Sequence, residues 1–562
     1  MTQTKETEKM HKGLSALPLG GVGEIGMNLM AYECDEEMIL VDVGLTFPDS
    51  RLPGVDLVLP DTEYIRKNVN RLKGIVITHA HEDHIGGLPY LWEDMPVDVY
   101  VTKFANCVLQ DKLKQVGLHN EVPVHEVEAG DRIKIGKHFD IEYVELTHSI
   151  PEGHGVAIRT PHGTIMHTGD YKFDETPSLG EPSNKKRLKE IGDEGVLTML
   201  GDSTNIFLED DSGSEGEVQE SLDSILAGRK NRVYLCTFAS NVGRVKSAIE
   251  VAHRHNRKVA LWGYSMKKML KYAHKCGYIE DKLYNNIISP EEAMELPRNE
   301  VLILITGSQG EPRAALNRII HGQILLNLQQ DDTVLMSSKI IPGNERPIYD
   351  LINKMVRQGV EVIHEKTDFV HVSGHAGQDE IKEMYELIRP EIAIPVHGEA
   401  AHLKAQAEFA KKLGVPKQFF IENGTRVHMA PGKPKALVEE SAAFGRVYVD
   451  GLNILDEDKF IIKERRQMSE QGVVTVAFSF DGETGKLNDD PVIHTRGIID
   501  PDLQPELVED AISNAQDAFY KAFSKNGADI AAIEEAVRIA VRRTFRVERE
   551  RNPVTIVTGL MV

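Results

Sequence analysis

The chain has 562 residues, which is more than one hydrophobic core can hold, so we expect about three to four domains. Its hydrophobic fraction of 41% is ordinary for a globular protein, and no apolar run approaches the roughly 20 residues of a membrane span, so we expect no membrane association. The net charge of −22 argues against a protein that binds nucleic acid through a basic surface alone, although bound divalent metals would add local positive charge.

The first residues and the cysteines indicate a reducing compartment. Residues 1–13 are charged or polar and contain no apolar signal core, so we expect a cytoplasmic address. The cysteines are widely scattered and form no C-x-x-C pair, which argues against a disulfide framework and against a thiolate zinc site. We therefore expect reduced, mostly buried thiols at Cys34, Cys107, Cys236 and Cys276.

From residue 14 to about residue 202 the sequence predicts short strands that end in polar or glycine-rich turns. The strand-like runs are MILVDVG, GIVITHAH, IEYVELTHS, TIMHTGD and VLTMLGD, and each polar residue of interest follows the end of one. Side chains at strand ends can converge on one site. Residues 21–26 also fit G-x-G-x-x-G, but the strand-like NLMAYEC follows where a dinucleotide site needs a helix N-terminus.

The segment H-A-H-E-D-H, residues 79–84, follows the strand GIVIT. Alternate residues of an extended segment point the same way, so His79 and His81 can share one metal. The turn that follows directs Asp83 and His84 to a second metal, and imidazole with carboxylate suits zinc or manganese. The alternative is a solvated histidine-rich turn, which further ligand-type residues at other strand ends make less favourable.

From residue 215 to about residue 365 predicted helices alternate with the apolar runs VYLCTF, KVALWG, VLILITG and TVLMSS, as in a parallel α/β unit. TGSQGEP in this unit could cradle a phosphate, but no lysine follows as in a P-loop, so we expect a tight turn. EIAIPVHGE then restores the strand-then-histidine pattern. The middle unit is therefore predicted to be inserted into the first domain.

Further candidate ligands complete a two-metal site. His148, Asp170 and His397 each directly follow a predicted strand. Taken singly, such residues are more often capping or hydrogen-bonding groups. Taken together with residues 79–84 they complete two sets of ligands. One ion would be bound by His79, His81 and His148, the other by Asp83, His84 and His397, and Asp170 would bridge the two. Asp42 is placed to orient a ligand histidine through its free ring nitrogen. Two ions some 3.5–4 Å apart suit phosphoryl displacement.

The last part of the chain predicts a separate small α+β domain. PGKPKALVEE, residues 431–440, is rich in proline and lysine and lacks periodicity, which indicates a surface connection. The strand VVTVAFSF, a GETG turn and amphipathic helices over residues 507–523 and 530–545 follow.

The chain resembles the metallo-β-lactamase superfamily in the order of Asp42, H-x-H-x-D-H, His148 and Asp170. Its inserted unit resembles the β-CASP insertion of the nucleic-acid-processing branch of that superfamily. The resemblance narrows to the bacterial ribonuclease J family and covers nearly the whole chain through LPLGGVGEIGMN, THAHEDHIGG, HSIPEGHG, GDSTN, TGSQGEP, HVSGHAGQDE and PVHGE.

The resemblance implies the architecture. It is an αββα metallo-β-lactamase sandwich with an inserted β-CASP parallel α/β domain and a small C-terminal α+β domain. The expected boundaries are residues 1–210 and 366–450 for the two parts of the sandwich, 211–365 for the insertion, 451–465 for a linker and 466–562 for the C-terminal domain.

The resemblance also implies hydrolysis of RNA in its maturation and decay, both endonucleolytic and 5′-to-3′ exonucleolytic, with single strands carrying a 5′-monophosphate preferred. The enzyme would use two divalent metal ions. Zinc is the most favoured ion, and manganese or magnesium are alternatives that could support activity. The chain would assemble as a homodimer or homotetramer.

By the same resemblance, Asp202 in GDSTN has an acid role and His375 stabilises charge on the substrate. Relatives often have serine where this chain has Gly377, which implies that a hydroxyl contact to the 5′-phosphate is lost or replaced. The remaining residues of the RNA-binding surface would be Ala239, Ser240, Asn241, His371, Val372, Ser373 and Gly374.

Two other classes of function stay open. The ligand set also fits a hydrolase of a lactam, a thioester or DNA, although a small-substrate hydrolase has no need of the inserted domain. A non-catalytic RNA-binding subunit is the third class, and the complete ligand set argues against it.

Overall fold

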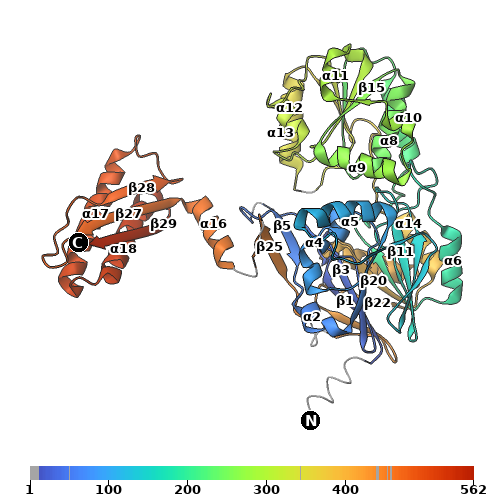
Figure 1. The fold of residues 1–562 in the computed structure, drawn as a ribbon, viewed down its shortest axis with the longest axis horizontal. Helices are drawn as coiled ribbons and strands as arrows, with labels where there is room; N and C mark the ends of the chain where they lie inside the picture. Colours follow the sequence, from blue (N-terminus) through green and yellow to red (C-terminus); the bar gives the residue numbers. More distant parts are fainter. Residues whose placement is uncertain (1–11, 50, 342, 438–441, 452, 456–458) are drawn as a thin grey trace, which may run out of the picture. The chain divides into compact units, whose positions relative to one another are not determined.

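The computed structural model describes residues 12–49, 51–341, 343–437, 442–451, 453–455 and 459–562. The described chain forms two compact units (Figure 1), residues 1–46 with 59–446 and residues 47–58 with 447–562. The N-terminal segment expected to lack a signal lies mostly outside the described residues, as do positions 438–441 of the expected surface connection. None of the described helices combines the length and the apolar character needed to cross a bilayer.

Two sheets form the body of the first unit. The first has eight strands in the order β24 (Lys435–Leu437), β23 (Arg426–Ala430), β1 (Leu14–Gly20), β3 (Leu29–Cys34), β4 (Glu37–Val41), β6 (Leu72–Val76), β7 (Val99–Thr102) and β8 (Val124–Val127). The second has seven in the order β22 (Lys417–Gln418), β20 (Ile392–Val396), β13 (Thr198–Asp202), β12 (Gly163–His167), β11 (His154–Thr160), β10 (Phe139–Glu145) and β9 (Arg132–Ile135).

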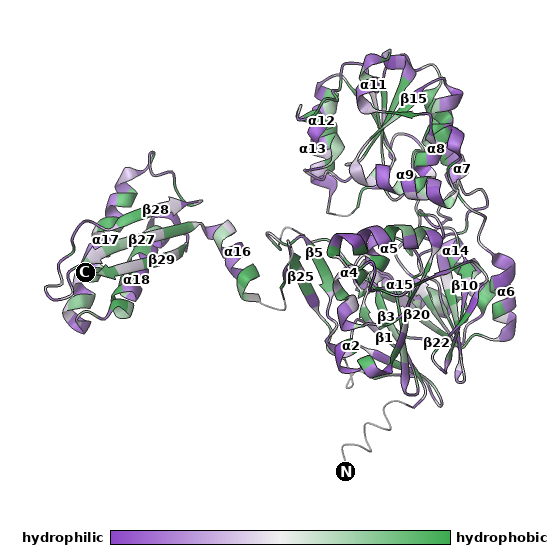
Figure 2. Cartoon of the chain, viewed as in Figure 1, coloured by the Kyte–Doolittle hydropathy of each residue, from purple (hydrophilic) through white to green (hydrophobic). Residues whose placement is uncertain are grey.

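The main core lies between these two sheets. Tyr32 and Val41 of the first sheet and Tyr143 and Ile394 of the second belong to one buried apolar cluster. Central strands such as β4 and β20 are fully buried, because helices cover the outer faces of the sheets. Figure 2 draws the hydrophobic residues in green. The helices are α4 (Leu88–Leu91), α5 (Lys103–Val116), α6 (Lys185–Glu194), α14 (Gln378–Ile388) and α15 (Ala400–Lys412). This is the expected αββα sandwich.

The predicted insertion holds a parallel six-stranded sheet of its own. Its strand order is β16 (Ile287–Ile288), β15 (Lys258–Trp262), β17 (Val301–Ile305), β14 (Val233–Cys236), β18 (Thr333–Met336) and β19 (Glu361–His364). Its helices are α7 (Glu215–Leu226), α8 (Val242–Arg254), α9 (Tyr264–Cys276), α10 (Asp281–Tyr284), α11 (Pro290–Glu295), α12 (Ala315–Ile320) and α13 (Glu345–Arg357). The chain leaves the sandwich after β13 and returns to it at α14, so the unit is inserted as predicted.

The second unit packs two long helices on a three-stranded sheet. α17 (Pro505–Asn526) and α18 (Ile530–Arg549) bury Phe519 and Phe545 against β28 (Val492–Arg496), β27 (Val473–Phe480) and β29 (Val554–Met561). The strand VVTVAFSF and both helices are confirmed. Residues 47–58 also join this unit, where Asp56 N–H donates to Val449 O at 2.8 Å, which the sequence did not suggest.

Two expected connections differ from the structure. Lys435–Leu437, within the expected surface connection, forms edge strand β24 paired with β23. In the expected linker at 451–465, residues 453–455 form β26 and residues 459–465 lie in α16 (Lys459–Gln471), while residues 452 and 456–458 lie outside the described residues. The conformation of such short strands is decided by pairing with a neighbouring strand, because their own sequences carry no strand pattern.

Candidate metal centre

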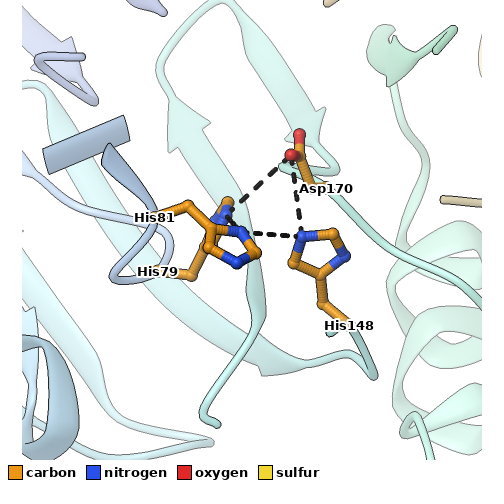
Figure 3. A group of neighbouring side chains, drawn as sticks. All are labelled: His79, His81, His148 and Asp170. Atoms are coloured by element: carbon orange, nitrogen blue, oxygen red, sulfur yellow. Dashed lines mark hydrogen bonds and ion pairs between the residues drawn. The ribbon is translucent and has the colours of Figure 1, made fainter. Parts of the chain in front are cut away.

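Three histidines and one aspartate converge at the ends of β6, β10 and β12 (Figure 3). His81 Nδ1 lies 3.1 Å from His79 Nε2 and 3.0 Å from His148 Nε2. Asp170 Oδ2 lies 3.9 Å from His79 Nε2 and 3.8 Å from His148 Nε2. Four ligands at a zinc bond length of about 2.1 Å stand about 3.4 Å apart in a tetrahedron, so this donor set fits a divalent ion.

A second group shares the same aspartate. His84 Nε2 lies 3.1 Å from Asp170 Oδ2 and 3.6 Å from Asp83 Oδ2, and His397 Nε2 lies 3.2 Å from Asp83 Oδ2. Asp83 and His84 come from the short helix α3 (Glu82–Ile85), whereas His397 follows β20. The structure therefore brings all seven sequence-predicted ligand residues together in two groups that could each hold an ion, with Asp170 in both.

Fixed partners select which histidine nitrogen faces each group. His84 Nδ1 donates to Asp42 Oδ2 at 2.7 Å, and Asp42 also accepts from the Thr78 amide and hydroxyl, each at 2.8 Å. His148 Nδ1 donates to Gly374 O at 2.6 Å. The Nε2 atoms of both rings are thereby left for a cation. Asp42 lies where the sequence predicted, next to a ligand-type histidine rather than in either group.

The electrostatics differ between the two groups. Burial lowers the pKa of His81 to about 4 and the pKa of His148 to about 3, so both rings are neutral at pH 7 and able to bind a metal. Burial opposes protonation of His84 too, but Asp170, Asp83 and Asp42 outweigh it and raise its pKa well above the usual value. A divalent cation would take the place of that proton.

Asp202 and His375 form a pair beside the second group. His375 Nδ1 donates to Asp202 Oδ2 at 2.7 Å, and His397 Nδ1 lies 3.0 Å from Asp170 Oδ1. Although burial opposes both changes, the pair raises the pKa of His375 and lowers the pKa of Asp202. Asp202 ends β13 and His375 precedes α14, so the two residues come from opposite sides of the insertion.

The glycine-rich segment at residues 21–26 has a structural role. Gly21 O accepts from the His397 amide at 2.8 Å, and β2 (Val22–Gly23) pairs with β21 (Gly398–Glu399) directly after that histidine. The next element is β3, which begins at Leu29, so the predicted strand is confirmed at the place where a dinucleotide site needs a helix. His397 is held with a φ of +50°.

The predicted RNA-binding residues are only partly assembled around the metal groups. Asn241 caps α8 by accepting from the Arg244 amide at 2.9 Å, and it lines a cavity that also includes His148 and Ser149. Ala239 and Ser240 lie in the partly exposed turn after β14, and no described contact joins them to the metal groups.

The segment at residues 371–375 runs directly alongside His148. Gly374 accepts from that ring, and a Cβ there would lie 3.0 Å from His148 Cε1. Ser373 Oγ accepts from the His375 amide at 3.1 Å, so this backbone donor is engaged within the segment itself. Val372 of the same segment is buried, whereas His371 is partly exposed.

Gly377 has no room for a side chain. A Cβ at this position would lie 2.0 Å from Asp210 O, and the Gly377 amide donates to Glu380 Oε2 at 2.7 Å. The 208–210 turn fills the space that a side chain here would need. The expectation that a hydroxyl contact to the 5′-phosphate is lost or replaced at this position stays a prediction.

Three supporting residues were not singled out from the sequence. Thr78 contacts Asp42 and His79, and Thr204 Oγ1 lies 3.1 Å from His397 Nδ1. The buried carboxylate of Glu380 accepts from Phe173 N, Gly377 N and Ser212. Thr78 adjoins His79 and Thr204 stands in GDSTN, so adjacency could have found these two, whereas Glu380 carried no signal.

Four family models match the chain. The model described as "Beta-lactamase superfamily domain" matches residues 38–184, and "Ribonuclease J, beta-CASP domain" matches residues 230–355. "Zn-dependent metallo-hydrolase RNA specificity domain" matches residues 359–421, and "Ribonuclease J C-terminal domain" matches residues 460–561.

Similar curated proteins span nearly the full length. The chain is 42% identical to "Ribonuclease J" of Sinorhizobium meliloti and 38% identical to "Ribonuclease J 1" of Streptococcus pyogenes, with 96% of each chain covered in both cases. It is 34% identical to "Ribonuclease J2" of Bacillus subtilis, over 98% of this chain and 99% of that one. A crystal structure of a protein of unknown function from Enterococcus faecalis superposes with a TM-score of 0.51 at 16% identity, over 76% of this chain and 100% of that one, a likeness of fold alone.

Proposed function

Because the chain belongs to the ribonuclease J family and is a metal-dependent ribonuclease, we propose that it cleaves RNA phosphodiesters with two divalent ions held by the two side-chain groups described above. The observation that carries the proposal is the shared carboxylate of Asp170, which belongs to both groups and is 2% exposed. His79, His81 and His148 would hold one ion. Asp83, His84 and His397 would hold the other, with Asp170 between them.

The residues around the ions would position the phosphate and move protons. When bound, a pair of divalent ions activates the attacking water and offsets the charge of the phosphate. Asp202 holds the Nδ1 proton of His375 and favours the charged ring, so His375 Nε2 can donate to a phosphate oxygen as negative charge develops. Asp42 keeps His84 in the orientation in which Nε2 faces the ion.

The choice of ion follows from the donor set. Five imidazole rings and two carboxylates favour zinc over magnesium, which prefers oxygen ligands and keeps several waters. We therefore propose zinc as the resident metal, with manganese or magnesium as alternatives that support activity.

The segment at residues 371–375 supports a proposal on whether RNA is cleaved from its 5′ end or at internal bonds. Its contact with His148 puts it beside the first metal group, where a terminal phosphate could be held one nucleotide from the reacting bond. The enzyme would then act as a 5′-to-3′ exonuclease that prefers a 5′-monophosphate, and as an endonuclease on internal bonds. Asn241, with Ala239 and Ser240, would contact the RNA from the insertion.

The C-terminal unit is proposed to support a homodimer or homotetramer. β29 is an edge strand of its sheet, and Ile556, Leu560 and Met561 are each more than half exposed on it. Such an apolar edge favours pairing with a second copy. We place the site of action in the cytoplasm.

The central test compares metal-loaded and chelated enzyme on 5′-labelled RNA, single-stranded DNA and a chromogenic lactam. RNA cleavage should require metal and should be abolished by His81→Ala and by Asp170→Ala. His125→Ala, which changes an exposed histidine outside both groups, should leave it intact. Cleavage of RNA by metal-free enzyme, or by both ligand variants, would refute the proposal.

A second test concerns the 5′ end. RNA with a 5′-monophosphate should be degraded faster than the same RNA with a 5′-triphosphate, because added phosphates bring charge without partners. Ser373→Phe should slow exonucleolysis more than internal cleavage, measured on linear and circular RNA with one preparation. Equal rates for both end groups would leave endonuclease activity as the better description.

A further inference from the structure

Two thiols face one another where α5 of the sandwich meets α9 of the insertion. Cys107 Sγ lies 3.8 Å from Cys276 Sγ, although the two residues are 169 positions apart in the sequence. Both side chains are partly exposed, whereas Cys34 and Cys236 are buried. The sequence spacing gave no reason to pair Cys107 with Cys276, and the fold brings them together.

Polar contacts fix the approach of the two helices around these thiols. Lys268 Nζ of α9 donates to Asp111 Oδ2 of α5 at 2.6 Å. Glu152 accepts from the Phe104 amide at 2.7 Å and from the Tyr278 hydroxyl at 3.0 Å, so one carboxylate joins the start of α5 to the residues after α9. The thiols therefore meet within an interface with defined contacts.

We propose that Cys107 and Cys276 are an oxidation site, at which a hydroperoxide converts the two thiols into a reversible disulfide between the sandwich and the insertion. A disulfide bond is about 2.0 Å long, so the sulfur atoms need to approach one another by about 2 Å. Side-chain rotation and a small helix adjustment can supply a movement of that size.

The chemistry balances with hydrogen peroxide as the oxidant. The Cys107 sulfur attacks one peroxide oxygen, the O–O bond breaks, and a sulfenic acid and one water result. The Cys276 sulfur then attacks the Cys107 sulfur and displaces the hydroxyl as a second water. Two electrons pass from the thiols to the peroxide, and a dithiol reverses the reaction by exchange.

The surroundings assign the order of the two steps. Burial, with smaller contributions from Cys107 and Glu152, raises the pKa of Cys276 to about 12. Cys276 is therefore a poor first nucleophile, so Cys107 attacks the peroxide first and Cys276 then resolves the sulfenic acid. The reaction is expected to be slower than that of an activated thiol.

The disulfide would act on the RNA-binding site through Glu152, which lies four residues after His148. One cavity is lined by His148 and Ser149 from the sandwich and by Asn241 and Tyr278 from the insertion. A covalent tie between α5 and α9 would hold these walls together and slow the motions that admit and release RNA. This consequence for turnover rests on the proposed function, whereas formation of the disulfide does not.

The first test maps the bond in the full-length protein. After treatment with hydrogen peroxide, free thiols should fall from four to two, and peptide mass mapping should find a Cys107–Cys276 cross-link that a dithiol removes. Cys107→Ser and Cys276→Ser should each abolish the cross-link, while Cys34→Ser and Cys236→Ser should leave it. A cross-link to Cys34 or Cys236, or overoxidation without any cross-link, would overturn the proposal.

The second test measures turnover of RNA by reduced, oxidised and re-reduced enzyme. Oxidation should lower turnover of the unaltered chain, dithiol should restore it, and Cys107→Ser enzyme should be unaffected by the same treatment. A mapped cross-link without any change in turnover would overturn the consequence for RNA while leaving the oxidation site in place. Enzyme that cleaves no RNA in any state would instead count against the proposed function.

Discussion

At the scale of single residues, the candidate metal centre depends on side chains that hold the histidines rather than on the histidines alone. His79 Nδ1, His84 Nδ1 and His148 Nδ1 each have a partner outside the metal groups, namely Thr78 Oγ1, Asp42 Oδ2 and Gly374 O. These contacts set the ring orientations before any ion binds. A site ordered in this way spends little free energy on rearrangement when metal arrives.

Asp42→Ala should weaken metal binding without removing a ligand. Its loss frees the His84 ring to rotate and leaves Nδ1 unpaired, so affinity for one of the two ions should fall about 10–100-fold. Metal titration by calorimetry should then resolve one weakened and one nearly unchanged site. Asp140→Ala serves as control, because Asp140 lies on the same sandwich but pairs with Arg132 at the surface. Equal weakening of both sites would contradict the assignment.

Glu215→Gln should destabilise the first unit in a pH-dependent way. Glu215 Oε1 lies 2.9 Å from Arg244 Nη2, and the two side chains are 8% and 0% exposed. Burial alone would raise the pKa of Glu215, but Arg244 outweighs it and lowers the pKa. Removing one partner leaves a buried guanidinium without its counter-ion, at a cost of about 3 kcal/mol.

The pH dependence has a definite sign. Because the folded-state pKa of Glu215 is lowered, its stabilisation is present above the unfolded-state pKa of about 4.3 and is lost as pH falls through the lower folded-state value. The difference between the variant and the unaltered protein should therefore shrink in acid. Urea unfolding followed by the fluorescence of Trp92 and Trp262, both in the first unit, can measure it. Glu220→Gln, an exposed change on the same helix, should show no such trend.

The ligand-type residues were predictable for two reasons. The ends of strands can be recognised in a single sequence, and metal ions are bound by only a few residue types, mainly histidine and aspartate in this chain. His79 to His84, His148, Asp170 and His397 all follow runs that form strands in the structure. Glu380 was not predictable, because its partners Phe173 and Ser212 lie far from it in the sequence. A buried carboxylate of this kind is recognised only from the donors that surround it.

At the scale of elements, apolar runs of five or more residues predicted strands well, and short or irregular elements were missed. β17 and β20 are fully buried and read as continuous apolar runs. β24 has three residues and no alternation, and its pairing with β23 decides its conformation. The role of residues 47–58 in the second unit was equally hidden, because it depends on contacts with residues after 446.

Gly377→Ser should damage the start of α14 rather than add a phosphate contact. The new Cβ would lie 2.0 Å from Asp210 O, so either the helix or the 208–210 turn must move. We expect a loss of about 1–3 kcal/mol in the stability of the first unit. Exonuclease preference for a 5′-monophosphate should not improve. Asp379→Ser, an exposed change in the same turn, provides the control, and a gain in 5′-end preference at full stability would contradict the prediction.

At the scale of the whole molecule, the C-terminal unit carries an apolar edge with no described use inside its own fold. Ile556→Asp combined with Leu560→Asp should place charges on that edge and yield a smaller species by light scattering, with the unit still folded by circular dichroism. Lys521→Asp, an exposed change on α17, should leave the mass unchanged. A mass unaffected by the double substitution would exclude this edge as the contact between copies.

The inserted topology also determines when, during translation, the residues of the second metal group become available. Asp83 and His397 meet at 3.2 Å, yet 314 positions separate them. At a translation rate of about 5–20 residues per second, a ribosome that has finished Asp83 needs roughly 16 seconds or more before His397 exists. Throughout that interval the nascent chain lacks His397, so its second metal group is incomplete. The nascent chain therefore has no complete metal centre while it is still close to the messenger RNA that encodes it.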